Sequence, residues 1–279
     1  VMEIYNRLKL KAMVKSKWGA FPSARFFDKE ESLKEAWRKA KKYRSYDSEV
    51  DDITWYDLDG FTLFERINGT YSSVGSEALY QRLRNFNFSY KQNPTIREEI
   101  QFQFACLGKQ DHNHVESYLS ETRNQKLPNT TFYLFCGLLP IAALLFVLVF
   151  PMTLSVLLLL GSILFNVIYY QIKKEKLQRE LICMGYLVQT VVCAKKLEKI
   201  KTPFQEELTK NLKPLASMTK FGISFRMKSN SEAEMMFDYL AMIFMLPFIS
   251  YNFVLKKLTN YEMQAKEMWR LLGELEVAG

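Results

Sequence analysis

Residues 132–170 read FYLFCGLLPIAALLFVLVFPMTLSVLLLLGSILFNVIYY, without one charged side chain. As a single helix this run would measure nearly ~60 Å, about twice the hydrocarbon thickness of a bilayer. Pro151 divides the run into halves of about 19 residues, and each half is long enough for one crossing. The sequence therefore predicts a transmembrane hairpin, two apolar helices joined by a very tight turn.

Basic residues flank this run at both ends, whereas the turn at Pro151 carries no charge. The flanking cations are Arg123 and Lys126 before the run, and Lys173, Lys174, Lys176 and Arg179 after it. Membrane proteins keep Lys-rich and Arg-rich loops on the cytoplasmic side. We therefore expect a cell-membrane protein with both termini in the cytoplasm.

A second apolar stretch, from Met235 to Val254, resembles a third span in length. It contains Asp238 and Pro247 and has basic residues on both sides, which argues against a crossing. A buried core helix and a helix in the membrane interface both explain the stretch. Within the hairpin, Pro140 and Asn166 are tolerable because neighbouring helices can satisfy freed or added polar groups.

The remaining sequence predicts helices throughout, so the expected fold class is all-α. Residues 1–50 form a basic helical arm, 51–127 a compact helical unit, 128–172 the hairpin and 173–279 long lever-like helices. Within 51–127, a capping box at Thr54 and Asp57 opens a helix that ends before Asn68. Residues 72–73 cap the next helix, Pro94 begins a third, and a fourth covers 114–123.

A heptad-like seam follows the second apolar span and indicates one long helix. Its apolar side chains recur at four-three spacing and are Leu177, Leu181, Met184, Val188 and Val191. Such a seam is typical of helices that pair, so the lever helices are candidates for a homo-oligomer interface.

Lys and Arg number 38 against 30 Asp and Glu, a formal net charge of +8. Solvated helix faces account for most of these charges, but the excess suits an anionic neighbour, either lipid or DNA. The candidate contacts lie at both ends of the seam and are Lys173, Lys174, Lys176, Arg179, Lys195, Lys196, Lys199 and Lys201.

The residues of common catalytic and metal sites are missing from the sequence. No Gly is followed by Lys-Ser or Lys-Thr, so the phosphate cradle of a P-loop is absent. The two histidines, His112 and His114, lack further metal ligands nearby, and the four cysteines form no CxxC pair. We therefore expect no catalytic, cofactor or metal site in this chain.

Residues 52–84 resemble the core domain of the MutS family of DNA mismatch-repair proteins. In that family a helix ends in Asn, and a Thr/Ser-rich turn with Gly leads into a helix that carries two Leu. These features fall here on Asn68, Thr70, Ser72, Ser73, Gly75, Leu79 and Leu83. The Leu-Tyr-x-x-Leu-Arg ending is similar to a membrane-anchored, MutS-related branch found in bacteria. Residues 271–276 resemble the end of the family's lever helix.

The resemblance covers about 50–127 and, more loosely, 173–277. It implies a helical core and levers that lie before an ATPase domain, where ATP and Mg would bind. The hairpin stands where mismatch-repair members have a DNA clamp. It implies a non-enzymatic core, lever and membrane-anchor part of a MutS-like ATPase. A DNA-binding module and a membrane scaffold that pairs with a second copy are the alternatives.

Overall fold

The computed structural model describes residues 2–17, 22, 28–46, 48–85, 94–110, 115, 118–119, 129–149, 151–202, 204–222, 224–225 and 232–278. Every regular element in these ranges is a helix, which confirms the all-α class. The fourth helix expected at 114–123, together with both histidines, lies largely outside the described residues.

The chain forms two compact units, each assembled from segments that are distant in sequence. Unit 1 comprises residues 1–121, 189–216 and 261–279, and unit 2 comprises 122–188 and 217–260. The long helix α10 (Gln178–Leu197) contributes its first half to unit 2 and its second half to unit 1.

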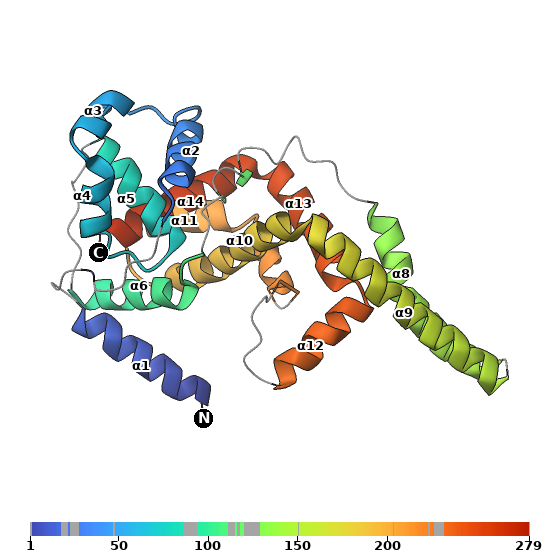
Figure 1. The fold of residues 1–279 in the computed structure, drawn as a ribbon. Helices are drawn as coiled ribbons and strands as arrows, with labels where there is room; N and C mark the ends of the chain where they lie inside the picture. Colours follow the sequence, from blue (N-terminus) through green and yellow to red (C-terminus); the bar gives the residue numbers. More distant parts are fainter. Residues whose placement is uncertain are drawn as a thin grey trace. The chain divides into compact units, whose positions relative to one another are not determined.

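Unit 1 is built around the pair α5 (Ser73–Asn85) and α14 (Glu262–Val277), which lie side by side (Figure 1). Helices α2 (Glu30–Ala40) and α4 (Gly60–Ile67) pack on α5, while α6 (Pro94–Leu107) and α11 (Gln205–Leu212) pack on α14. The remaining helices are α1 (Met2–Ser16), packed on α6, and α3 (Asp52–Asp57), packed on α4.

The first helix of the compact unit begins at a different cap from the one predicted. Asp51 caps α3, because its carboxylate accepts hydrogen bonds from the backbone N–H groups of Ile53 and Thr54, both at 2.8 Å. Thr54 therefore lies inside the first turn rather than at the N-cap. The predicted single helix also breaks at Asp59, whose φ of 49° places it in the left-handed region. The structure confirms the caps and starts near Ser72 and Pro94.

Unit 2 contains the apolar helices. They are α8 (Thr130–Leu145), the short 3-10 helix η2 (Phe146–Leu148), α9 (Met152–Lys176), α12 (Glu232–Ile243) and α13 (Leu246–Asn260). A second 3-10 helix, η3 (Ala216–Phe221), precedes α12. Helix α8 runs beside α9, α12 also packs on α9, and α13 packs on α8. Helix η2 ends before Pro151 and α9 begins directly after it, at the position where the sequence predicts the division of the apolar run.

Among the described helices, α9 alone is long and apolar enough to cross a membrane. Helix α8 is apolar but shorter, so the first half of the predicted hairpin stays a prediction. Helices α12 and α13 pass the same test only as a pair, and they meet at an angle of 74°. The stretch from Met235 to Val254 is therefore a bent pair and not one straight helix.

The predicted seam lies on the buried face of α10. Leu181, Met184, Val188 and Val191 are each at most 2% exposed, because other parts of the same chain cover them. Leu177 itself ends α9, so a short break separates α9 from α10 where the sequence predicts one continuous helix. Pairing of two copies through this seam would have to displace helices that already cover it.

Two glycines of unit 2 offer a matched pair of tests. A Cβ on Gly137 in α8 would stand 2.6 Å from the carbonyl oxygen of Phe244, whereas a Cβ on Gly161 in α9 would meet nothing within 4 Å. We expect Gly137→Ala to destabilise unit 2 by about 1–3 kcal/mol through overpacking. We expect Gly161→Ala to be neutral or stabilising by up to about 1 kcal/mol. Thermal unfolding in lipid nanodiscs checks both, and equal effects would contradict this packing.

Candidate functional site

The candidate site is the crossing of α5 and α14, where two glycines let the helices approach closely. A Cβ on Gly273 of α14 would stand 2.6 Å from Cβ of Ala78 in α5. A Cβ on Gly75 would overlap the carboxylate of Glu276. Because neither glycine has a side chain, the backbone of α14 reaches the first turn of α5.

Glu276, in the last turn of α14, binds the N-terminus of α5. Its Oε1 accepts hydrogen bonds from the backbone N–H groups of Tyr71 at 2.5 Å and Ser72 at 2.9 Å. The Ser72 hydroxyl donates to Oε2, and the same hydroxyl oxygen accepts from Gly75 N–H at 3.1 Å. The carboxylate therefore occupies the position where a helix N-terminus stabilises negative charge.

Burial controls the protonation of this carboxyl. It raises the pKa of Glu276 from an ordinary 4.5 to about 7, and this effect outweighs the opposing ones. The hydroxyl and N–H of Ser72, the N–H of Tyr71 and the charge of Lys109 all lower the pKa. The carboxyl of Glu276 therefore changes its protonation near neutral pH. We call the hydrogen bonds that join Glu276 to Tyr71 and Ser72 the latch.

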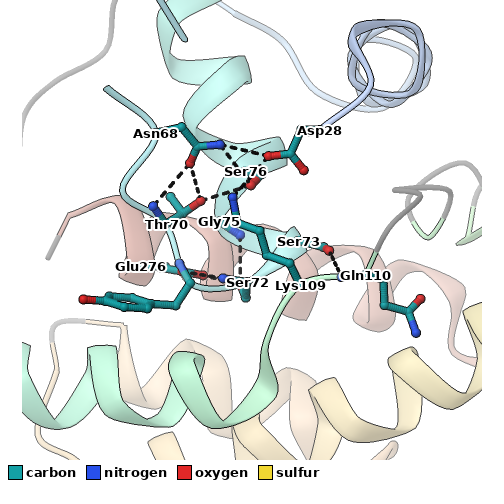
Figure 2. Close-up of polar contacts among 11 residues, drawn as sticks. Asp28, Asn68, Thr70, Ser72, Ser73, Gly75, Ser76, Lys109, Gln110 and Glu276 are labelled. Atoms are coloured by element: carbon teal, nitrogen blue, oxygen red, sulfur yellow. Dashed lines mark hydrogen bonds and ion pairs between the residues drawn. The ribbon is translucent and has the colours of Figure 1, made fainter. Parts of the chain in front are cut away.

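A polar network surrounds the turn before α5 (Figure 2). Asn68 donates through Nδ2 to Asp28 at 2.9 Å, and its Oδ1 accepts from the hydroxyl of Thr70 at 2.6 Å. Asp28 also pairs with Lys109 at 3.1 Å, and both side chains are buried. The side chains of Asp28, Asn68 and Lys109 therefore stabilise the turn through hydrogen bonds and an ion pair.

Further along the crossing, two side-chain pairs join the same helices. Trp269 of α14 donates its indole N–H to Glu77 of α5 at 2.8 Å, and Arg82 pairs with Glu274 at 2.6 Å. Together with Glu276, these bonds fix α14 to α5 along its C-terminal half.

The structure places the predicted basic residues in two groups that belong to different units. Lys173, Lys174 and Lys176 form the last turn of α9, and Arg179 opens α10. Lys173 and Lys174 lie over the rings of Tyr169 and Tyr170, each at 5.7 Å. In unit 1, the end of α10 and the turn after it carry the exposed residues Lys195, Lys196, Lys199 and Lys201.

Within the described part of the chain, no cluster of three or more His, Cys, Asp or Glu side chains could hold a metal ion. The described cysteines are all free thiols. His112 and His114 lie outside the described residues.

Sequence reasoning did not assign Glu276 a partner. The available signal was its position: it lies four residues after Leu272 and next to Leu275, on the face of α14 that those leucines bury. A carboxylate on a buried helix face requires hydrogen-bond donors, although the pattern cannot say which element supplies them.

Searches of protein-family models, curated proteins and solved structures found no match to this chain. Over the described residues, the fold is all-helical with one helix long and apolar enough to span a membrane, and the site is a buried carboxylate that joins two helices of unit 1.

The raised pKa of Glu276 predicts a pH-dependent stability of unit 1. The pKa of Glu276 is higher in the folded protein than in the unfolded chain. The stabilisation that this difference gives unit 1 is therefore complete below about pH 4.5 and is lost as pH rises through about 7. The free energy of unfolding should fall by at most about 1.4 kcal/mol for each pH unit in this range, and we call this dependence the slope.

Glu276→Gln should remove this slope, because the amide stays neutral and keeps an acceptor for the two N–H groups. Glu274→Gln removes the same charge from the same helix and should retain the slope. Urea unfolding followed by tryptophan fluorescence between these pH values measures it, since Trp37, Trp55 and Trp269 all lie in unit 1. A slope unchanged in Glu276→Gln would contradict the role of this carboxyl.

Proposed function

We propose that this chain is the core, lever and membrane-anchor part of a MutS-like, ATP-dependent protein. It is not an enzyme by itself and couples a downstream ATPase domain to the membrane. One observation carries the proposal: the two stretches that resemble the family are in direct contact. Ser72 and Gly75 belong to the core-like stretch, Glu276 belongs to the lever-like stretch, and they form the latch.

The latch supplies a route for coupling. Any displacement of the end of α14 acts on the first turn of α5 through Glu276, and on its second half through Glu274 and Arg82. At its other end α14 follows α13 after the single residue Tyr261. The helix therefore connects by the shortest chain path to unit 2, which holds the apolar helices.

The anchor is the hairpin of α8 and α9. Helix α8 continues directly into η2, so the apolar helical segment extends beyond the 16 residues of α8 alone. Exposed apolar side chains cover both helices, including Phe135, Leu138, Leu157, Leu160 and Leu164. Such a surface is costly in water and suits hydrocarbon. Both termini then lie in the cytoplasm of a bacterial cell, with ATP and Mg bound in the ATPase domain.

The basic residues at the end of α9 suit anionic lipid, because Tyr169 and Tyr170 accompany them as in an interfacial aromatic belt. DNA is the alternative ligand for the group from Lys195 to Lys201, and a lipid-independent, salt-dependent affinity would identify it. A membrane scaffold or dimerisation module without a nucleic-acid role is the second candidate function, favoured by the exposed apolar surface of unit 2. Sedimentation that shows only monomers would remove dimerisation.

The coupling is tested in the full-length gene product. We expect it to hydrolyse ATP with Mg, and we expect residues 1–279 alone not to do so. ATP should change hydrogen exchange in residues 69–76, and Glu276→Leu combined with Ser72→Ala should abolish that change while ATP still binds. Met263→Ala, an exposed position of α14, is the matched control. Hydrolysis by residues 1–279 would contradict the proposal.

The topology is tested by thiol labelling in intact cells, in a Cys106→Ser background because that thiol is exposed. Single cysteines replace Met2, Thr153 and Gly279. Since the turn of the hairpin is the only external part, an impermeant reagent should label position 153 alone. Labelling at position 279 would require an odd number of crossings and would exclude a cytoplasmic ATPase after this chain.

A further inference from the structure

Asn166 is a polar side chain in the middle of the apolar helix α9, and it is fully buried. Its Nδ2 donates two hydrogen bonds to backbone carbonyl oxygens of other helices. One acceptor is Cys136 in α8, at 2.7 Å, and the other is Ile243 at the end of α12, at 2.8 Å. A single amide therefore ties three helices of unit 2 together.

Both acceptors lack a helical donor. In an α-helix the carbonyl of residue i accepts from the N–H of residue i+4. The residue four positions after Cys136 is Pro140, which has no N–H. Ile243 is the last residue of α12, so its carbonyl is one of the groups that a helix end leaves without a partner. Asn166 donates to both.

The bend between α12 and α13 is held at the same place. Met245 has a φ of 56°, which is strained for a side chain of this kind, and the two helices meet at 74°. The carbonyl of Phe244 packs so closely on Gly137 that a Cβ there would stand 2.6 Å from it. We call residues 243–247 the elbow. It lies against α8 and α9 at the level of Asn166.

Helix α12 leads to the elbow from the end of α9. Asp238 of α12 lines a pocket together with Tyr170 and Lys174 near the end of α9. Five residues later, Ile243 accepts a hydrogen bond from Asn166 near the middle of α9. Lys174 and Asn166 are eight positions apart on α9, about 12 Å along the helix axis. Since Lys174 belongs to the basic flank, the elbow lies about 12 Å deeper than that flank.

Four of the five exposed residues at 236–240 of α12 are apolar, and the fifth is Asp238. Met236, Phe237, Tyr239 and Leu240 each expose 45–67% of their area, and α12 packs on the one helix that can span a membrane. The exposed surface of α9 is also largely apolar. Because α12 packs on α9, the two surfaces adjoin within unit 2. Acyl chains that surround α9 would therefore also meet α12.

We propose that α12 and α13 form a third membrane-embedded element, a bent wedge that enters the leaflet beside α9 down to Asn166 and leaves on the same side. Its partner is the acyl-chain layer of the bilayer. The basic residues Arg226 and Lys228 precede the pair, and Lys256 and Lys257 lie near the end of α13, so both flanks stay on one side. At 12 and 15 residues, each helix is also too short for the ~30 Å hydrocarbon core.

Asn166 is the positioning residue of this wedge. Backbone groups without a partner cost several kcal/mol each in hydrocarbon, and non-helical backbone is tolerated there only where the protein satisfies it. The carbonyl oxygen of Ile243 in the elbow and that of Cys136, four residues before Pro140, are two such groups, and one side chain satisfies both. This inference rests on the membrane anchoring in the proposed function, because the depth of the elbow is defined relative to α9.

The experiment places an environment-sensitive fluorophore on single cysteines, in the Cys106→Ser background, in vesicles of phosphatidylcholine and phosphatidylglycerol. Leu240→Cys reports on α12, Leu157→Cys on α9, and Tyr56→Cys on an exposed site of unit 1. Doxyl-labelled acyl chains quench a fluorophore in the bilayer, and aqueous cobalt ions quench one in water. We expect lipid quenching at positions 240 and 157 and cobalt quenching at position 56.

The outcomes separate the two proposals. Cobalt quenching at 240 with lipid quenching at 157 would overturn the wedge and leave the anchor intact. Cobalt quenching at 157 would overturn the anchor and the wedge with it.

The role of Asn166 is tested by a rescue. Asn166→Leu keeps the side-chain size but removes both donors, so hydrogen exchange in residues 243–248 should increase and thermal stability in vesicles should fall. Adding Pro140→Ala restores an N–H for the carbonyl of Cys136 and should recover part of the lost stability without slowing exchange at the elbow. Ser162→Ala, which removes only a bond within α9 to Leu159, is the control. Absence of any recovery, or an equal effect of Ser162→Ala, would overturn the assignment.

Discussion

A helix leaves backbone groups without partners wherever it begins, ends or meets a proline, and burial makes each such group costly. Both units of this protein are organised around the removal of that cost. In unit 1 the free N–H groups before α5 donate to Glu276, and in unit 2 the carbonyl freed by Pro140 and the carbonyl at the end of α12 accept from Asn166. In each case one side chain from a distant part of the sequence satisfies the groups.

The hydrogen bonds of Glu276 and Asn166 also explain why the helices of each unit approach one another so closely. A carboxylate reaches the amides of a helix start only if the helix axes approach closely, and Gly75 and Gly273 allow this. An amide reaches two carbonyls on different helices only if those helices converge, and Gly137 allows that. In each unit, the glycines therefore allow the helices to approach closely, and the buried polar side chain stabilises the close approach through its hydrogen bonds.

The local features of the fold could be predicted from sequence. Helix breaks at Pro151 and after Ile67, and the starts at Ser73 and Pro94, follow from residue types that act on their immediate neighbours. The cap of α3 was predicted at Thr54 and lies at Asp51, because both residue types can cap a helix and they stand only three positions apart. Asn166 was predicted to rely on neighbouring helices, but its two acceptors, like the partner of Glu276, depend on contacts between distant segments that spacing does not encode.

The position of α14 in the chain has a consequence for biosynthesis. Helix α14 is the last of the described helices, yet it packs on α5 and contributes buried apolar side chains to unit 1. During translation, α5 emerges early and waits for its partner while α8 and α9 leave the ribosome. The apolar helices α8 and α9 are therefore complete before unit 1 can close, because closure requires α14.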